Sequence, residues 1–250
     1  IIFKPHIISV PFLGYSILGI TMRIQSHVPL NNILGDNDQN AKYQYVAFID
    51  IMGIISTFER SRDTAMIFIL RFHSVISQLI ARGKIDKMIT YNPFNDGCFL
   101  TADDSKVLLD LIKNVFIEIS RIFIDEKEHK KKFIIRGGFT RGTILHGTDI
   151  PGNVKNFIID DNYKQRFLLG QPIAQAVKLE QTGGYFCINV SPAIASEVES
   201  VNNWFNWIEE SNIDVNQFKN CVGEYNTNSI HPHKNKHMQY FNKMISAITR

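Results

Sequence analysis

The order of apolar segments along the chain constrains its fold more than any other feature. From Tyr43 onward, short runs rich in β-branched and aromatic residues alternate with longer runs whose apolar residues repeat at helical spacing. Along the chain, these segments come in the order strand, helix, strand, strand, helix, strand. This order predicts an α+β fold with a ferredoxin-like βαββαβ core, extended by a further hairpin strand, a helix and a strand.

The predicted elements are bounded by turn and capping residues. Ser61 and Asp63 open the first long helix, and Gly83 ends it. The turn Asn92–Gly97 joins the second and third strands. The other predictions are strands at 45–51, 86–91, 98–101 and 185–190, helices at 105–122 and 171–182, a strand pair at 133–136 and 143–146, and a short helix at 192–199.

The chain divides into three parts by composition. Residues 43–200 hold all the strongly patterned segments and are predicted to form the main domain. Residues 201–250 read as a helical or irregular C-terminal appendage. Residues 1–42 form an arm whose stretch 7–22 has no charged side chain, but this stretch is shorter than the roughly 20 apolar residues of a spanning helix. An arm packed on the domain or on a partner is favoured over a membrane role.

Charge and cysteine content exclude several classes of protein. Lys and Arg number 27 against 24 Asp and Glu, and this net charge of +3 argues against a dedicated nucleic-acid binder. The 3 cysteines are far apart and form no CxxC motif, so neither a disulfide framework nor a zinc site is predicted. A reducing, cytoplasmic location fits this pattern. With 44% hydrophobic residues, the chain can bury a core.

Two carboxylates are predicted to meet at one edge of the sheet. Asp50 interrupts the apolar strand YVAFIDI, where a carboxylate without a partner is costly to bury. Asp96 lies in the turn before the third strand. The first and third strands of a βαββαβ unit are antiparallel neighbours, so the end of one meets the start of the other. Asp50 and Asp96 would then face each other.

Two facing carboxylates repel each other unless a cation lies between them or one carries a proton. Mg²⁺ and similar hard cations prefer such oxygen ligands and are commonly shared with substrate phosphates. The alternative is that Asp50 satisfies a local backbone group and Asp96 is an ordinary turn residue. The loop Gly53–Thr57 follows Asp50, and its backbone N–H groups are candidates for binding phosphate.

Four segments together resemble class III nucleotidyl cyclase catalytic domains. They are YVAFIDIMGIISTF, NPFNDGCFL, FIIRGGFTRGTILHG and LLGQPIAQAVKLEQTGGYFCINVS, and they occur in the order of that family. They cover about residues 43–192. Within the family, the sequence most resembles the bacterial Pycsar-type pyrimidine cyclases, which make cyclic UMP or cyclic CMP during phage infection.

The resemblance implies a nucleoside triphosphate substrate and two divalent metal ions, Mn²⁺ or Mg²⁺. Asp50 and Asp96 would bind the metals, and Ile51 would add its backbone carbonyl oxygen. The backbone amides of Gly53, Ile54, Ile55, Ser56 and Thr57 would hold the triphosphate. The resemblance also implies a homodimer, with the metal-binding residues of one subunit facing helix residues of the other.

The base-reading positions of the family fall here on Asn92 and Phe167, with Tyr91 beside the first. Neither residue matches the Lys and Asp pair of adenylyl cyclases or the Glu and Cys pair of guanylyl cyclases. These departures disfavour a purine substrate and leave UTP and CTP both open.

The transition-state helix also departs from the family pattern. Its Asn and Arg positions fall on Ala174 and Lys178, and Lys keeps the charge without the two-pronged geometry of Arg. Gln175 or Arg136 could take over the missing contacts.

The favoured function is therefore a uridylate or cytidylate cyclase in antiphage defence, whose product activates a separate effector protein. The alternative is a degenerate cyclase-like module that binds a nucleotide and dimerises without turnover. A ferredoxin-like nucleic-acid module is disfavoured by the charge balance and by the lack of an aromatic strand signature.

Overall fold

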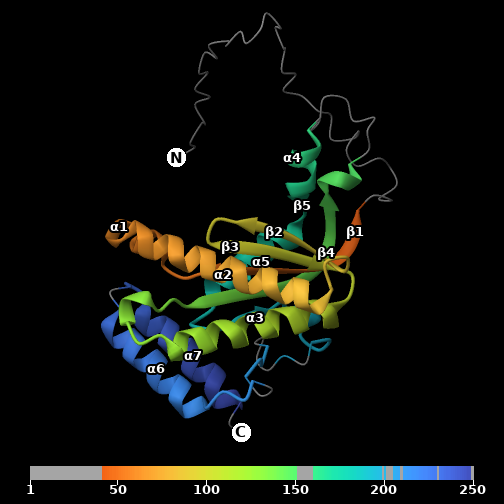
Figure 1. The fold of residues 1–250 in the computed structure, drawn as a ribbon. Helices are drawn as coiled ribbons and strands as arrows, with labels where there is room; N and C mark the ends of the chain where they lie inside the picture. The colour runs from red at the N-terminus through yellow and green to blue at the C-terminus, as the bar shows by residue number, and fades with distance from the viewer. Residues whose placement is uncertain are drawn as a thin grey trace, which may run out of the picture.

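The structure is a computed structural model that describes residues 41–150, 160–198, 200, 205–208, 211–229 and 231–248. The predicted N-terminal arm, 1–42, lies almost entirely outside the described residues. Figure 1 shows a sheet with helices packed on both of its faces.

A mostly antiparallel sheet of six strands organises the fold. Its main path runs β2–β3–β1–β4–β5, and β6 pairs with β4 in parallel. The strands are β1 (Lys42–Ile51), β2 (Ile89–Phe94), β3 (Gly97–Ala102), β4 (Ile135–His146), β5 (Leu168–Leu169) and β6 (Ile188–Val190). The pairing of β1 with β3 is antiparallel, as the sequence predicts for a βαββαβ core.

The helices divide between the two faces of the sheet. The helices are α1 (Ile54–Arg60), α2 (Arg62–Gly83), α3 (Ser105–Asp125), α4 (Asp161–Arg166), α5 (Gln171–Thr182), α6 (Val215–Asn228) and α7 (Lys234–Ile248). Alternate residues of β1 enter different cores, because successive side chains of a strand point to opposite faces. Ala47, Ile49 and Ile51 pack in the large core with α2 and α3, whereas Val46 and Phe48 pack with Ala176 of α5.

β4 differs from its predicted form. The sequence predicted two strands around the glycines, but β4 is one continuous strand, Ile135–His146. Gly138 lies within it because the backbone of α5 crosses directly above. A Cβ at this position would come within 2.0 Å of the Ala176 carbonyl oxygen. The glycines therefore permit close helix–strand packing and do not mark a turn.

The segment after Asp50 also differs from its predicted form. The sequence predicted a loop at Gly53–Thr57, but all of it after Gly53 is the first turn of α1, a short helix that precedes α2. Gly53 has φ of 76°, a left-handed conformation that glycine adopts without strain, and it turns the chain from β1 into α1. Ser61 then caps α2 by accepting a hydrogen bond from the Thr64 amide, as predicted.

Three further elements differ from their predicted form. The strand predicted at 185–190 covers only Ile188–Val190. The strand predicted at 86–91 lies at Ile89–Phe94. The short helix predicted at 192–199 is a single 3₁₀ turn, Pro192–Ile194.

The C-terminal residues supply two helices that share the large core. Figure 1 shows α6 and α7 beside α3, at the end of the molecule farthest from α4. Trp207, Phe218 and Phe241 are fully buried in the same apolar cluster as Phe116 and Phe123 of α3. The part predicted as an appendage is thus packed against the helices that cover the sheet.

Within the described residues, α2 alone is long and apolar enough to cross a membrane by length and composition. Its buried residues, Ala65, Phe68, Phe72, Ile76 and Ile80, follow one helical stripe and face the core. The outer face of α2 also carries exposed apolar residues, Met66, Ile67 and Leu70.

Candidate active site

Asp50 and Asp96 are held by the pairing of β1 with β3. Asp50 lies opposite Gly97 in the register of the two strands, so Asp96 is the next residue along. The Ile51 amide donates a hydrogen bond of 3.0 Å to the Asp96 carbonyl oxygen, which closes the end of the ladder. The two carboxylates therefore meet at one sheet edge, where the sequence predicted them.

Both carboxylates line a cleft of about 420 Å³, which we name the carboxylate cleft. Most of the predicted site residues line it together. They are Asp50, Ile51, Gly53, Ile54, Ile55, Ser56, Asp96 and Arg136. Glu59, His231 and Pro232 also line the cleft and were not among the predicted residues.

Asp50 is the most perturbed acid of the cleft. Burial, helped by the nearby carboxylates of Glu180 and Asp96, raises the pKa of Asp50 from its ordinary value of 3.8 to about 8. Arg136 and the Ile51 amide oppose this rise. Asp50 thus holds a proton at neutral pH unless a cation offsets the negative charge around it.

Glu180 is a buried acid of this region that sequence reasoning missed. Its side chain is only 2% exposed and forms an ion pair with Arg136, whose Nε donates to the Glu180 carboxylate. Burial raises the pKa of Glu180, and Arg136 opposes the rise. The one signal in the sequence is its spacing, because Pro172, Ala176 and Glu180 form the buried stripe of α5.

The donor atoms of the cleft fit a hard divalent cation. The carboxylates of Asp50 and Asp96 line the same cleft. The raised pKa of Asp50 shows that a cation beside it would stabilise its charged form. Within the described residues, no group of three or more His, Cys, Asp or Glu side chains could hold a metal. The protein therefore offers a two-carboxylate set, which is the arrangement that Mg²⁺ shares with substrate phosphates and water.

α1 presents its first turn to the carboxylate cleft. The hydroxyls of Ser56 and Thr57 both donate to the Gly53 carbonyl oxygen, at 2.9 and 3.1 Å. These bonds hold the turn in a fixed shape. The first amides of a helix have no intrahelical acceptor, so those of Ile54 and Ile55 are available to an anion. Thr57 lines the opposite side of α1 instead.

The two predicted base-reading positions lie together outside the carboxylate cleft. Asn92 Nδ2 donates to the Arg166 carbonyl oxygen at 3.3 Å, which places Asn92 beside the residue preceding Phe167. Because a carbonyl oxygen can only accept, this bond orients the Asn92 side-chain amide with Nδ2 toward Arg166. Asn92 Oδ1 is buried and has no hydrogen-bond partner among the described residues. Tyr91 is half exposed.

The predicted residues of α5 divide between two of its faces. Gln175 faces inward, where its amide accepts from Thr140 Oγ1 at 3.0 Å and donates to Ser191 Oγ at 3.3 Å. Lys178 and Ala174 are one turn apart and both exposed. Neither Gln175 nor Lys178 lines the carboxylate cleft of its own chain.

No family model matches this chain, and no curated protein matches it. Solved structures of nucleotidyl cyclase domains are similar in fold. An adenylate/guanylate cyclase/hydrolase from Silicibacter pomeroyi is 17% identical, with a TM-score of 0.47, over 64% of this chain and 81% of that one. A guanylate cyclase domain from Catenaria anguillulae, solved with GTP, is 16% identical, with a TM-score of 0.46, over 63% and 82%. The adenylyl cyclase CyaB from P. aeruginosa is 17% identical, with a TM-score of 0.44, over 64% and 81%.

Proposed function

We propose that this chain is a pyrimidine nucleotide cyclase, which converts UTP or CTP to the 3′,5′-cyclic monophosphate and pyrophosphate. The observation that carries the proposal is the β1–β3 register, which brings Asp50 and Asp96 into one cleft with the first turn of α1. The ordered sequence resemblance to class III cyclases supports the same reading.

The predicted residues of the carboxylate cleft each have a role in this proposal. Asp50 and Asp96 bind Mn²⁺ or Mg²⁺, with the carbonyl oxygen of Ile51 as a further ligand. When bound, such ions lower the pKa of the ribose 3′-hydroxyl and neutralise charge on the triphosphate. The amides at the start of α1 hold the triphosphate, and Arg136 adds positive charge beside Asp50. Fixing the 3′-hydroxyl against the α-phosphate supplies much of the rate, because positioning dominates phosphoryl transfer.

Asn92 supplies a hydrogen-bond acceptor for the base. Its Oδ1 is buried and has no hydrogen-bond partner in the described part of the chain, while its Nδ2 donates to the Arg166 carbonyl oxygen. An acceptor in this position suits N3–H of uracil or the exocyclic amine of cytosine. It does not select between UTP and CTP.

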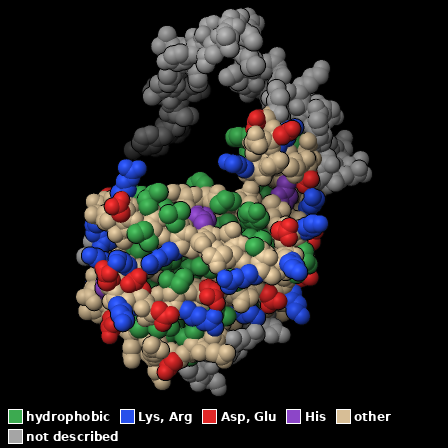
Figure 2. All heavy atoms as spheres, viewed as in Figure 1, with side chains coloured by type: hydrophobic (Ala, Val, Ile, Leu, Met, Phe, Trp, Pro, Cys, Tyr) green, Lys and Arg blue, Asp and Glu red, His purple; other side chains and the backbone are tan. Residues whose placement is uncertain are grey.

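A symmetric homodimer completes the site in this proposal. Asn92, Phe167 and Lys178 lie outside the carboxylate cleft of their own chain. In this proposal, they serve the cleft of a second copy. Apolar side chains are available for such an interface. Tyr91 and Phe94 of β2 are 50% and 64% exposed, and Figure 2 shows apolar side chains gathered over α2 and the β2–β3 hairpin.

A nucleotide-binding module without turnover is the second candidate. Ala174 cannot form a side-chain hydrogen bond, and Arg136 is already committed to the buried Glu180. In this reading, the fold binds a nucleotide and dimerises, and signals without chemistry. The two readings differ only in whether a cyclic product forms.

The resemblance also extends the proposal to cellular context. The enzyme would act in the cytoplasm, and its cyclic product would activate a separate effector protein in antiphage defence.

Incubation with ATP, GTP, CTP and UTP plus Mn²⁺, with mass spectrometry of the products, tests the function. We expect cyclic UMP or cyclic CMP from the folded, dimeric protein. A purine product in excess would contradict the pyrimidine assignment. No cyclic product from any nucleotide, with nucleotide binding retained, would establish the second candidate instead.

A further inference from the structure

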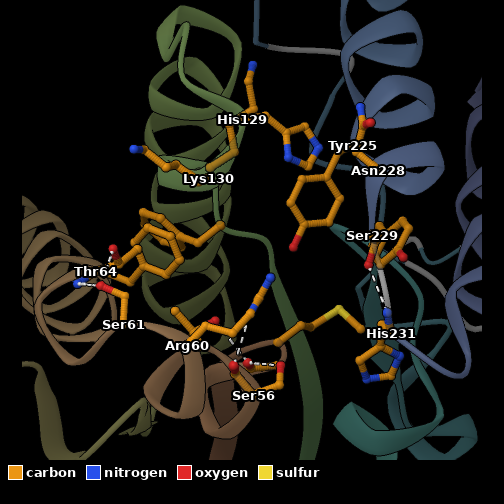
Figure 3. Close-up of a pocket in the computed structure, with 17 residues that line it drawn as sticks. Ser56, Arg60, Ser61, Thr64, His129, Lys130, Tyr225, Asn228, Ser229 and His231 are labelled. Atoms are coloured by element: carbon orange, nitrogen blue, oxygen red, sulfur yellow. Dashed lines mark hydrogen bonds between the residues drawn. The ribbon is translucent and has the colours of Figure 1, made fainter.

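A second cavity lies on the other side of α1 from the carboxylates. It measures about 400 Å³ and is enclosed by α1, the start of α2, the segment 129–133 and the end of α6 (Figure 3). It shares only Gly53, Ser56 and His231 with the carboxylate cleft. We name it the cation pocket, because of the charges that line it.

Among the described residues, the lining of the cation pocket is basic and contains no acid. Its basic residues are Arg60, Lys130, Lys132, His129 and His231. None of its lining residues is Asp or Glu, although acids are nearly as numerous as bases in the chain as a whole. Such one-signed lining raises the local concentration of anions, because the charges act together inside a concave surface.

Arg60 and Tyr225 point into the same space from opposite walls. Figure 3 shows the guanidinium of Arg60 and the hydroxyl of Tyr225 directed toward each other from α1 and α6. Arg60 Nε donates to the Ser56 carbonyl oxygen at 3.1 Å, which holds the side chain in place. Among the described residues, Arg60 has no carboxylate partner. Burial raises the pKa of Tyr225, and the nearby charge of Arg60 opposes the rise.

His129 leaves a buried polar atom unsatisfied at the wall of this pocket. Its ring stacks on Tyr225, with centroids 5.2 Å apart. Its Nε2 is buried and has no hydrogen-bond partner among the described residues. Buried polar atoms are nearly always bonded, so an unsatisfied one beside a cavity marks a place for a bound group.

The two lysines are partly committed elsewhere. Lys132 donates to the Phe123 carbonyl oxygen at 2.7 Å, and Lys130 lies 3.8 Å from Glu128. The principal anion-binding group is therefore Arg60, whose planar guanidinium matches two oxygens of a phosphate at once.

We propose that the cation pocket binds a small phosphate monoester with an apolar or aromatic group. Arg60, His129 and the Tyr225 hydroxyl bind the phosphate. Phe68, Phe133 and Tyr185 form the apolar wall for the remainder. The volume lies in the range of small-molecule sites and exceeds what a single phosphate ion fills.

This inference is independent of the proposed cyclase activity. It uses no metal, neither carboxylate and no residue of α5. It can therefore be tested without turnover, in EDTA, where the carboxylate cleft cannot hold its cations.

Isothermal titration with phenyl phosphate as the probe tests the inference, with inorganic phosphate as the comparison ligand. Arg60→Gln removes the central cation, and Arg62→Gln removes another exposed cation, two residues away, that does not line the pocket. We expect saturable binding of phenyl phosphate to the wild type, weakened about tenfold or more by Arg60→Gln and unchanged by Arg62→Gln. His129→Asn should also weaken binding.

Several results would overturn the inference. They are the absence of saturable binding to the wild type, equal losses in Arg60→Gln and Arg62→Gln, and loss of binding in Asp96→Asn with Arg60→Gln unaffected. Equal affinities for phenyl phosphate and inorganic phosphate would show that the pocket does not bind the apolar group of the ligand. Thermal unfolding of each variant verifies that its fold is intact.

Discussion

The carboxylate cleft and the cation pocket lie on two sides of one short helix and carry opposite charges. The cleft brings Asp50 and Asp96 together and raises the pKa of Asp50 to about 8. Within the part of the chain that the structure describes, five basic residues and no acid line the cation pocket. Both are of similar volume, and both use residues of α1. The two cavities therefore differ in the charge of their lining and not in their volume.

The two regions also differ in how their charges are balanced. In the cleft, the available cation Arg136 is paired with the buried Glu180, so the two aspartates depend on an external cation. In the pocket, Arg60 has no acidic partner within the described part of the chain, so it depends on an external anion. Each region therefore depends on an external ion of opposite sign, and α1 lies between the two.

Substitution of either aspartate should have the largest effect, because it should lower cyclase turnover and leave ligand binding in the cation pocket unchanged. We expect Asp50→Ala or Asp96→Ala to lower cyclase turnover about 100-fold or more, the size typical of losing a group that stabilises charge in a transition state. Phenyl phosphate binding in EDTA should be unchanged in both variants. Asp86→Ala, at an exposed position outside both regions, is the control for turnover. Intact turnover in the two aspartate variants would show that the metal assignment is wrong.

Gly138→Ala should disturb the carboxylate cleft, although Gly138 lines neither cavity. The added Cβ would come within 2.0 Å of the Ala176 carbonyl oxygen, so α5 must move away from β4 and carry Glu180 with it. We expect a loss of roughly 3 kcal/mol or more in the free energy of unfolding, measured by urea denaturation.

Gly223→Ala is the matched change for comparison with Gly138→Ala. It lies within α6, where an added Cβ meets nothing within 4 Å. It should gain up to about 1 kcal/mol, because alanine is the better helix former. Similar effects of the two substitutions would contradict the close approach of α5 to β4.

Asp50→Asn should stabilise the metal-free protein in a pH-dependent way. Folding raises the pKa of Asp50 from 3.8 to about 8, so the folded state binds its proton more tightly than the unfolded state does. Wild-type stability therefore falls as pH rises between these values, by up to about 1.4 kcal/mol per unit. The variant lacks this loss. We expect the stability of the variant to be close to that of the wild type near pH 4, and its advantage to grow to as much as about 5 kcal/mol at pH 8.

Denaturation in EDTA at several pH values measures this difference. If the gain in stability were the same at pH 4 and pH 8, the raised pKa of Asp50 would not be its cause.

The sequence was sufficient to predict the meeting of Asp50 and Asp96. A charge in an apolar strand, a turn acid and the known order of strands in a βαββαβ core determine that edge of the sheet. The prediction for β4 was wrong, because its glycines suggested a turn between two strands and β4 is one continuous strand. Their real role depends on the position of α5, which lies some 40 residues later in the chain and is set by tertiary packing.

The cation pocket could not be predicted from local patterns. Its walls come from residues 52–68, 129–133, 185 and 225–231, which share no motif and no spacing. Glu180 was hidden for a related reason. Its spacing on α5 indicates burial, but its partner Arg136 is 44 positions away, so nothing nearby in the sequence indicates that this acid is paired.

The turn at Gly53 and the helix α1 that follows it have a thermodynamic consequence. Because α1 forms a wall of both cavities, a ligand that shifts it from one side changes the shape offered on the other. Any such change obeys linkage: the factor by which an occupant of the pocket alters nucleotide affinity equals the factor by which nucleotide alters that occupant's affinity. The position of α1, a helix of 7 residues, would then affect the affinity of both sites.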